Sequence, residues 1–231
     1  MMYDEIINKL KTSNADLSNV NAKNAELICI DVLHYLDNTD IIHEGKQRNV
    51  ELRAHAMLSL GKVYDRKYNY PTAIECYQTA IECYKQLKDT AGIAKATDSI
   101  GSIYSDSGDY ARALEYHQIA MEMLKDSNYL ENISTFLINI GNTYQRLTNY
   151  HKALDAFNEA LNIKYDLKDK LGIALLYNNI GIIYERMSDY KRSLEYYEKS
   201  LNIKEELGKK PNTSYTLTNI GVLSRRAKLA T

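Results

Sequence analysis

Apolar residues recur along this chain every three or four positions, in runs separated by short polar breaks. One run starts at Ile140 and continues through Tyr144 and Leu147, and the next starts at Tyr150 and continues through Phe157. This spacing places apolar side chains on one face of an α-helix. The pattern therefore predicts an all-α protein built from pairs of helices joined by short turns.

The helix pairs repeat with a period of 40 residues. A glycine occurs five times at this step, each time after an aliphatic residue, and tyrosines and small residues return at fixed places after it. The glycines are Gly61, Gly101, Gly141, Gly181 and Gly221; two tyrosine series run from Tyr64 to Tyr184 and from Tyr70 to Tyr190. Such regularity indicates structural repeats, each of which buries its apolar face only by stacking on its neighbours.

A short polar residue precedes each second helix of a pair, at Asn69, Asp109, Asn149 and Asp189. Side chains of this type cap helix N-termini by accepting a hydrogen bond from a free backbone N–H group. In the fourth repeat, Ser193 and Ser200 replace the two alanines of the other repeats. This replacement predicts a looser joint there.

Residues 49–231 are therefore expected to form the repeat array, with four full repeats and the first helix of a fifth. Residues 1–48 do not follow the period. Apolar spacing at Ile28, Val32, Leu33 and Leu36 predicts that they form an N-terminal helical cap or a degenerate repeat. Either the last helix caps the stack or the natural protein continues past Thr231, and its repeat-like apolar positions favour continuation.

Composition narrows the possible functions. A net charge of −1 and a pI near 6.5 give no general attraction to nucleic acid or to anionic membranes. No segment has the pattern of a secretory signal or the length of a membrane span. The three cysteines, Cys29, Cys76 and Cys83, lack a CxxC spacing, so we interpret them as free thiols and expect a cytoplasmic protein.

The sequence contains none of the common catalytic motifs. There is no HExxH zinc motif, no nucleophile elbow and no phosphate-binding loop. His117 stands where other repeats carry an aromatic residue, and we interpret it as a packed core residue. Cys76 and Cys83 lie on one helix face without further ligands, which makes a poor metal site. We expect a protein that is not an enzyme and needs no metal or cofactor.

The series Ile140-Gly141, Tyr144, Tyr150, Ala153, Phe157 and Ala160 resembles the tetratricopeptide repeat, whose usual period is about 34 residues. The 40-residue units are similar to the expanded repeats of kinesin light chains and of bacterial tetratricopeptide regulators. The resemblance implies a right-handed superhelical α-solenoid of antiparallel helix pairs. It also implies that the first helix of each pair lines a concave groove that binds a protein or peptide.

The family's groove positions are carried over to this chain at two residues before and one residue after each repeat glycine, and one helical turn further on. The series of these positions starts at Ser59 and includes Val222 near its end. The residues that we predict to bind a partner are Lys62, Arg66, Lys95, Asn139, Asn142, Arg146, Asn179, Arg186 and Asn219. Asparagine amides both donate to and accept from a peptide backbone. The basic residues favour an acidic partner segment.

Two interpretations of the function stay open at this stage. The first is a peptide-binding or protein-binding scaffold that uses the groove, although another face of the repeats is the alternative surface. The second is a sensory or regulatory domain of a larger signalling protein, which controls an output domain absent from this chain. The family's clamp for a C-terminal carboxylate is not expected, because Ile138, Tyr215 and Asn219 occupy its basic places. The sequence leaves the oligomeric state open.

Overall fold

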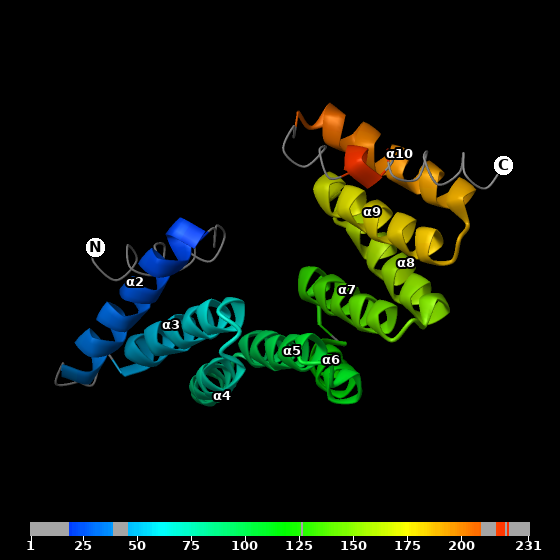
Figure 1. The fold of residues 1–231 in the computed structure, drawn as a ribbon. Helices are drawn as coiled ribbons and strands as arrows, with labels where there is room; N and C mark the ends of the chain where they lie inside the picture. The colour runs from blue at the N-terminus through cyan, green and yellow to red at the C-terminus, as the bar shows by residue number, and fades with distance from the viewer. Residues whose placement is uncertain (1–18, 39–45, 126, 209–215, 220, 222–231) are drawn as a thin grey trace. The chain divides into compact units, whose positions relative to one another are not determined.

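The protein is described here by a computed structural model of residues 19–38, 46–125, 127–208, 216–219 and 221. The described residues form α-helices and turns, so the predicted all-α fold is confirmed (Figure 1). The chain divides into two compact units, Met1–Asp126 and Ser127–Thr231. The helices of the first unit are α2 (Asn19–Asn38), α3 (Lys46–Arg66), α4 (Tyr70–Leu87), α5 (Thr90–Asp106) and α6 (Tyr110–Leu124). Those of the second are α7 (Leu130–Arg146), α8 (Tyr150–Asp166), α9 (Lys170–Arg186) and α10 (Tyr190–Glu206).

Each predicted repeat is a pair of helices in contact. Helix α3 packs on α4 and α5 on α6 in the first unit, and α7 packs on α8 and α9 on α10 in the second. Connections of three residues join the two helices within each pair. Connections of two or three residues also join α4 to α5 and α8 to α9. Because these connections are short, the helices that they join are antiparallel. Successive pairs stack through α4 and α5, and through α8 and α9.

The same turn connects the two helices of every pair. The backbone N–H of the residue before the second helix donates to the carbonyl of a tyrosine five residues earlier, as from Asp109 to Tyr104 (2.8 Å) and from Asp189 to Tyr184 (2.9 Å). The residue before the donor has a left-handed backbone, with φ of 87° at Gly108, 58° at Thr148 and 61° at Ser188. This hydrogen bond closes the first helix.

Three of the four predicted N-caps are confirmed. The side chains of Asp109, Asn149 and Asp189 accept from the backbone N–H three residues on, whereas Asn69 precedes α4 without such a bond. Two caps were not predicted. Asp89 and Asp169 cap the first helices α5 and α9 by accepting from the N–H groups of Gly92 and Gly172, at 2.9 Å each.

The repeat glycines lie directly against aromatic rings of the second helices. A Cβ atom added to Gly61, Gly141 or Gly181 would come within 2.5, 2.5 or 2.7 Å of the rings of Tyr77, Phe157 or Tyr197, respectively. In the second repeat the partner of Gly101 is His117, which is completely buried. His117 Nδ1 lies 2.6 Å from Asp98 Oδ1, so its prediction as a packed core residue is confirmed.

Helix α2 covers one side of α3. Its side chains Cys29, Val32 and Leu36 pack with Leu52, Ala56, Leu60 and Cys76 in one buried cluster. The three cysteines are buried free thiols, as expected. The prediction that residues 1–48 form a cap or a degenerate repeat stays a prediction, because residues 1–18 and 39–45 lie outside the described part. The predicted first helix of a fifth repeat also lies mostly outside it.

The serines of the fourth repeat do not leave a gap. Ser193 Oγ donates to the carbonyl of Gly181 (2.8 Å), and Ser200 Oγ donates to the carbonyl of Ala174 (2.6 Å). Both side chains are fully buried. The expectation of a looser joint is therefore wrong for these contacts, because each hydroxyl links α10 to α9 through a satisfied hydrogen bond.

Two buried lysines occupy the same repeat position in very different surroundings. Lys164 Nζ lies 2.6 Å from Glu131 Oε1 and 3.0 Å from Asp169 Oδ2. Burial lowers the pKa of Lys164, but the hydrogen bonds and charges of Glu131 and Asp169 raise it more. Lys204 instead donates to Thr216 Oγ1 (2.8 Å), with no carboxylate partner among the described residues, and burial lowers its pKa.

Replacing Gly141 with alanine should destabilise the protein by about 1–3 kcal/mol, because the new methyl group overpacks the Phe157 ring. Gly221 is a matched control at the same repeat position, where an added Cβ meets no atom of the described residues within 4 Å. Its alanine variant should be neutral or more stable by up to about 1 kcal/mol. Urea unfolding measures both changes, and equal stability of G141A and the parent would contradict the packing.

Lys164→Met and Lys204→Met should change stability in opposite directions. The first removes a paired cation and should cost about 1–2 kcal/mol, since its carboxylates are partly exposed. The second removes a buried charge and should stabilise the protein at pH 7. Because the folded pKa of Lys204 is depressed, the parent gains stability as pH rises towards 10.5, so the advantage of Lys204→Met should shrink there. Urea unfolding at pH 7 and pH 9.5 tests this, and a destabilised K204M would contradict it.

Candidate binding surface

In the first unit, the predicted binding residues lie on α3 and α5. Lys62 is half-buried on α3, Arg66 is exposed one turn later, and Lys95 is exposed on α5. Lys95 and Arg66 are near enough to Lys62 for their charges to act on it. Burial lowers the pKa of Lys62, and the positive charges of Lys95 and Arg66 lower it further. The structure therefore brings these three predicted residues together.

Two carboxylates act in the same region: Asp65 was not predicted to line it, whereas Asp106 stands at one of the groove positions implied by the resemblance. Burial raises the pKa of Asp65 to about 6, the negative charge of Asp106 adds to this rise, and Arg66 opposes it. The surface is therefore not uniformly positive. Its cationic part is at Lys62 and Lys95, and its acidic part is at Asp65 and Asp106. The signal in the sequence is that Asp106 replaces the arginine of the other repeats.

In the second unit, the predicted residues lie on α7 and α9. Asn139 and Asn142 are half-buried on α7 and Arg146 is exposed; Asn179 is half-buried on α9 and Arg186 is exposed. Asn139 and Arg146 already interact with other groups of the protein. Asn142 and Asn179 have no hydrogen-bond partner among the described residues, and their amides are not sealed from solvent. Two amides are thus available to a ligand.

One position implied by the resemblance is wrong. Ser59 is only 1% exposed, because α2 packs across this side of α3. Its hydroxyl donates to the carbonyl of His55 at 2.7 Å, and the Cys29 thiol lies beside it. The amide nitrogen of Asn219 is also buried, and it has no partner among the described residues. Val222 lies outside the described part.

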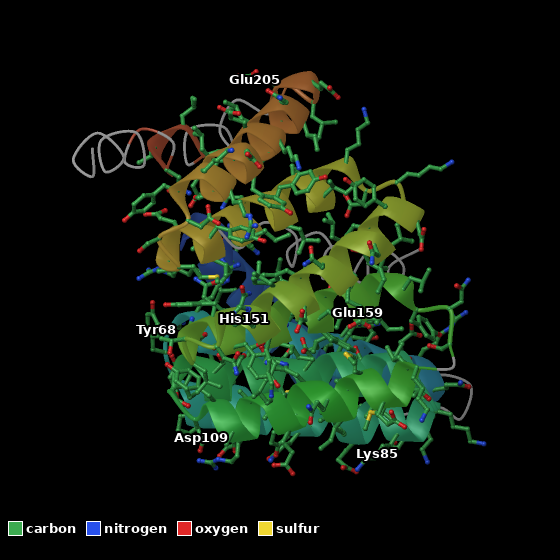
Figure 2. The ribbon with its side chains drawn as sticks, turned by 90° about the vertical axis from the view of Figure 1, so that its right-hand side faces the viewer. Tyr68, Lys85, Asp109, His151, Glu159 and Glu205 are labelled. Atoms are coloured by element: carbon green, nitrogen blue, oxygen red, sulfur yellow. The ribbon has the colours of Figure 1, made fainter. Side chains whose placement is uncertain are left out.

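No other feature of the described residues competes as a chemical site. They bring together no group of three or more metal-ligating side chains. A shallow depression of about 460 Å³ is lined by side chains of α6, including Ile119 and Met121, and by Lys125 directly after it. The outer faces of the second helices carry solvated side chains such as His151 and Glu159 on α8 (Figure 2). Within the described helices none is long and apolar enough to cross a membrane.

Comparison with protein families decides the identity of the repeats. A model described as tetratricopeptide repeat matches residues 92–166 and 172–229, and a second model of the same description matches residues 53–87. These segments cover most of the chain and include all four repeat glycines that contact rings. The chain belongs to the tetratricopeptide repeat family.

Solved structures of similar fold cover nearly all of this tetratricopeptide repeat chain. BtubC (BKLC) from P. vanneervenii is 18% identical, with a TM-score of 0.75 over 90% of this chain and 84% of that chain. The apo form of RapI is 17% identical, with a TM-score of 0.67, and the match covers 96% of this chain and 72% of that chain. A Rap protein complexed with competence and sporulation factor is 15% identical, with a TM-score of 0.67, and the match covers 99% of this chain and 73% of that chain. At these identities the likeness establishes a shared repeat fold, and no curated protein matches by sequence.

The two units carry different polar residues on the exposed faces of their first helices, and the roles of the repeat positions explain this difference. Tetratricopeptide repeats use the glycine and the aromatic residue for packing, which leaves the neighbouring positions of the first helix free to vary. In the first unit these positions carry serines and charged residues, and in the second they carry asparagines, arginines and one isoleucine. The fold is therefore common to the family, whereas the chemistry of these faces belongs to this chain.

Proposed function

We propose that this tetratricopeptide repeat protein binds an extended segment of a partner protein along the exposed faces of its first helices. The observation that carries the proposal is the pair of half-buried amides at Asn142 and Asn179, which have no internal partner among the described residues. A polar group that is partly shielded from water and unbonded gains most from a ligand that completes its hydrogen bonds. A peptide backbone offers both a donor and an acceptor to each amide.

The neighbouring amide of Asn178 provides an internal comparison. Asn178 Oδ1 accepts from Thr216 Oγ1 at 3.3 Å, and this residue is buried. One position later, Asn179 lies on the exposed side of the same helix and has no such partner. The use of Asn178 for packing and the availability of Asn179 support a binding role for the exposed face.

A relative of the same fold supports a binding function in general terms. The Rap protein was solved in complex with competence and sporulation factor, while RapI was solved in its apo form. The repeat fold of that Rap protein thus holds another molecule. We infer that the present chain also acts by binding and not by catalysis. Its three free, buried thiols fit a reducing compartment, which favours the cytoplasm.

The triple variant N142A/N179A/R186A should bind the partner at least about tenfold more weakly, because two amide contacts and one charge are lost. The partner is captured from the source organism, and the bound segment is mapped by crosslinking before affinities are measured by titration. Helicity and melting temperature should change little, because the three side chains make no hydrogen bond or ion pair to the described residues.

A matched control removes the same kinds of side chain from the outer helices. Asn158, Asn162 and Lys191 are exposed on α8 and α10. The variant N158A/N162A/K191A should bind like the parent. If the first variant bound as tightly as the parent, or the control lost the same affinity, the assignment to the first-helix faces would be wrong.

A regulatory domain is the second candidate, and the connection between α6 and α7 favours it. Helix α7 starts after Tyr129, which provides no side-chain cap, whereas Asp89 and Asp169 cap α5 and α9. Asn132 stands at the place of Gly92 and Gly172, and its buried amide nitrogen finds no partner among the described residues. The N-terminus of α7 therefore lacks the side-chain cap that starts α5 and α9, so this helix end has less to resist a change on binding. A kinase, cyclase or DNA-binding domain in the same reading frame would support regulation, and a stop codon after Thr231 would support an adaptor.

A further inference from the structure

A cluster of tyrosines lies where α8, α9 and α10 meet in the second unit. The ring centres of Tyr177 on α9 and Tyr196 on α10 are 5.7 Å apart, and their planes are tilted by 56°. Tyr184, about two turns after Tyr177, stacks on Tyr196 with ring centres 5.5 Å apart. The hydroxyl groups of Tyr177 and of Tyr165, on α8, share a hydrogen bond. Three helices therefore contribute to one aromatic cluster.

The ammonium group of Lys199 lies over two rings of this cluster. Its Nζ atom is 4.8 Å from the centre of the Tyr196 ring and 5.7 Å from that of the Tyr177 ring. At such distances the face of an aromatic ring attracts a cation. Glu195 stands one helical turn before Lys199, at the usual spacing for an ion pair on a helix. Lys199 nevertheless has no ion pair to any described residue, so the rings hold this cation in place of a carboxylate.

The second repeat indicates which members of the cluster serve the repeat itself. Tyr104 and Tyr116 pair there with ring centres 5.3 Å apart, as the equivalent tyrosines do in the fourth repeat. At the places of Tyr177 and Lys199, however, the second repeat has a threonine and an isoleucine. The pair of rings is thus shared packing, whereas the third ring and the lysine are additions of the fourth repeat.

We propose that Tyr177 and Tyr196 form a binding site for the ammonium group of a lysine from a partner protein, and that Lys199 occupies this site in the unbound protein. A primary ammonium fits because Lys199 itself places one over both rings. The hydroxyl oxygens of Tyr165 and Tyr177 also lie beside the site and can accept hydrogen bonds from N–H groups. A quaternary ammonium has the same charge but no N–H group to donate.

The carboxylates of the neighbouring second helices favour a basic partner. Glu195 and Glu198 are exposed on either side of Tyr196 along α10, and Asp155 and Glu159 are exposed on α8 (Figure 2 labels Glu159). None of these carboxylates has an ion pair to the described residues. A basic segment would gain attraction from them, whereas an acidic segment would be repelled.

The cluster is open to solvent and separate from the amides of the proposed function. Tyr165 is 49% exposed and Lys199 is also exposed, so the lysine can leave the rings without unpacking the core. Tyr177 and Asn179 are two residues apart on α9, which places their side chains about 200° apart around the helix. A ligand at the rings therefore lies on the other side of α9 from Asn179.

The test measures binding of two labelled peptides with blocked ends to the full chain at low salt, one of alternating lysine and glycine and one of alternating glutamine and glycine. The parent should bind the lysine peptide and not the glutamine peptide. Y177L/Y196L should bind the lysine peptide about tenfold more weakly, because two ring faces are lost while every charge remains. Y177F/Y196F should retain most of the affinity, since phenylalanine keeps the ring.

Lys199→Gln should bind the lysine peptide about threefold more tightly than the parent, because it frees the rings. Loss of a positive charge by itself also favours a cationic peptide. Lys191→Gln is therefore the matched control, since Lys191 is exposed on the same helix and lies over no ring of the described residues. Its gain should stay below about 1.5-fold. Equal gains in the two variants would overturn the role of Lys199 as the internal occupant.

Y104L/Y116L removes the equivalent pair of rings from the second repeat and should bind like the parent. Equal affinity of Y177L/Y196L and the parent, or an equal loss in Y104L/Y116L, would overturn the proposal. Melting temperatures check that each variant is folded. If Y177L/Y196L does not fold, the comparison of K199Q with K191Q decides the outcome.

Tetramethylammonium distinguishes a lysine side chain from a small quaternary cation. Its competition with the lysine peptide, lost in Y177L/Y196L, would support a cation site at the rings. Binding of tetramethylammonium without any binding of the lysine peptide would overturn the lysine assignment. N142A/N179A/R186A should bind the lysine peptide within about twofold of the parent, so failure here is distinct from failure of the proposed function.

Discussion

Each of the four described helix pairs depends on an aromatic or imidazole ring that lies against a glycine of the facing helix. Any larger residue than glycine would place a Cβ atom inside the ring's contact distance, at 2.5–2.9 Å. The glycine is thus required by the close approach of two helices and not by its backbone freedom, since it lies inside a helix. Because the contact returns every 40 residues, successive pairs are built alike and can stack in the same way.

The close approach also determines which residues remain for function. The second helices turn their alanines and rings inward, and the first helices contribute the glycine and its aliphatic neighbour to the same core. The polar residues next to them on the first helix stay at least partly exposed, as at Asn142 and Asn179. The same turn, closed by a hydrogen bond to a tyrosine carbonyl, connects the two helices of every pair, so each pair presents its first helix in a similar way. The polar residues of the first helices therefore differ from repeat to repeat, while the way in which the two helices of a pair pack is shared.

The period made the fold predictable, because a glycine, a tyrosine and an alanine repeated at one step describe helix packing directly. The caps at Asp89 and Asp169 were missed, although an aspartate three residues before a glycine was visible in both. Burial of Ser59 was not predictable from the period, because it depends on α2, which does not follow the repeat. Lys62 and Lys95 were predicted as part of one basic surface, but the partial burial of Lys62, which lowers its pKa, was not predictable from the period.

The most direct measurement of the central claim is a crystal structure of the chain with a mapped partner segment bound. The account predicts that the segment lies along the exposed faces of the first helices, with its backbone hydrogen-bonded to Asn142 and Asn179. A segment bound on the outer faces of α8 and α10, with both amides untouched, would contradict it.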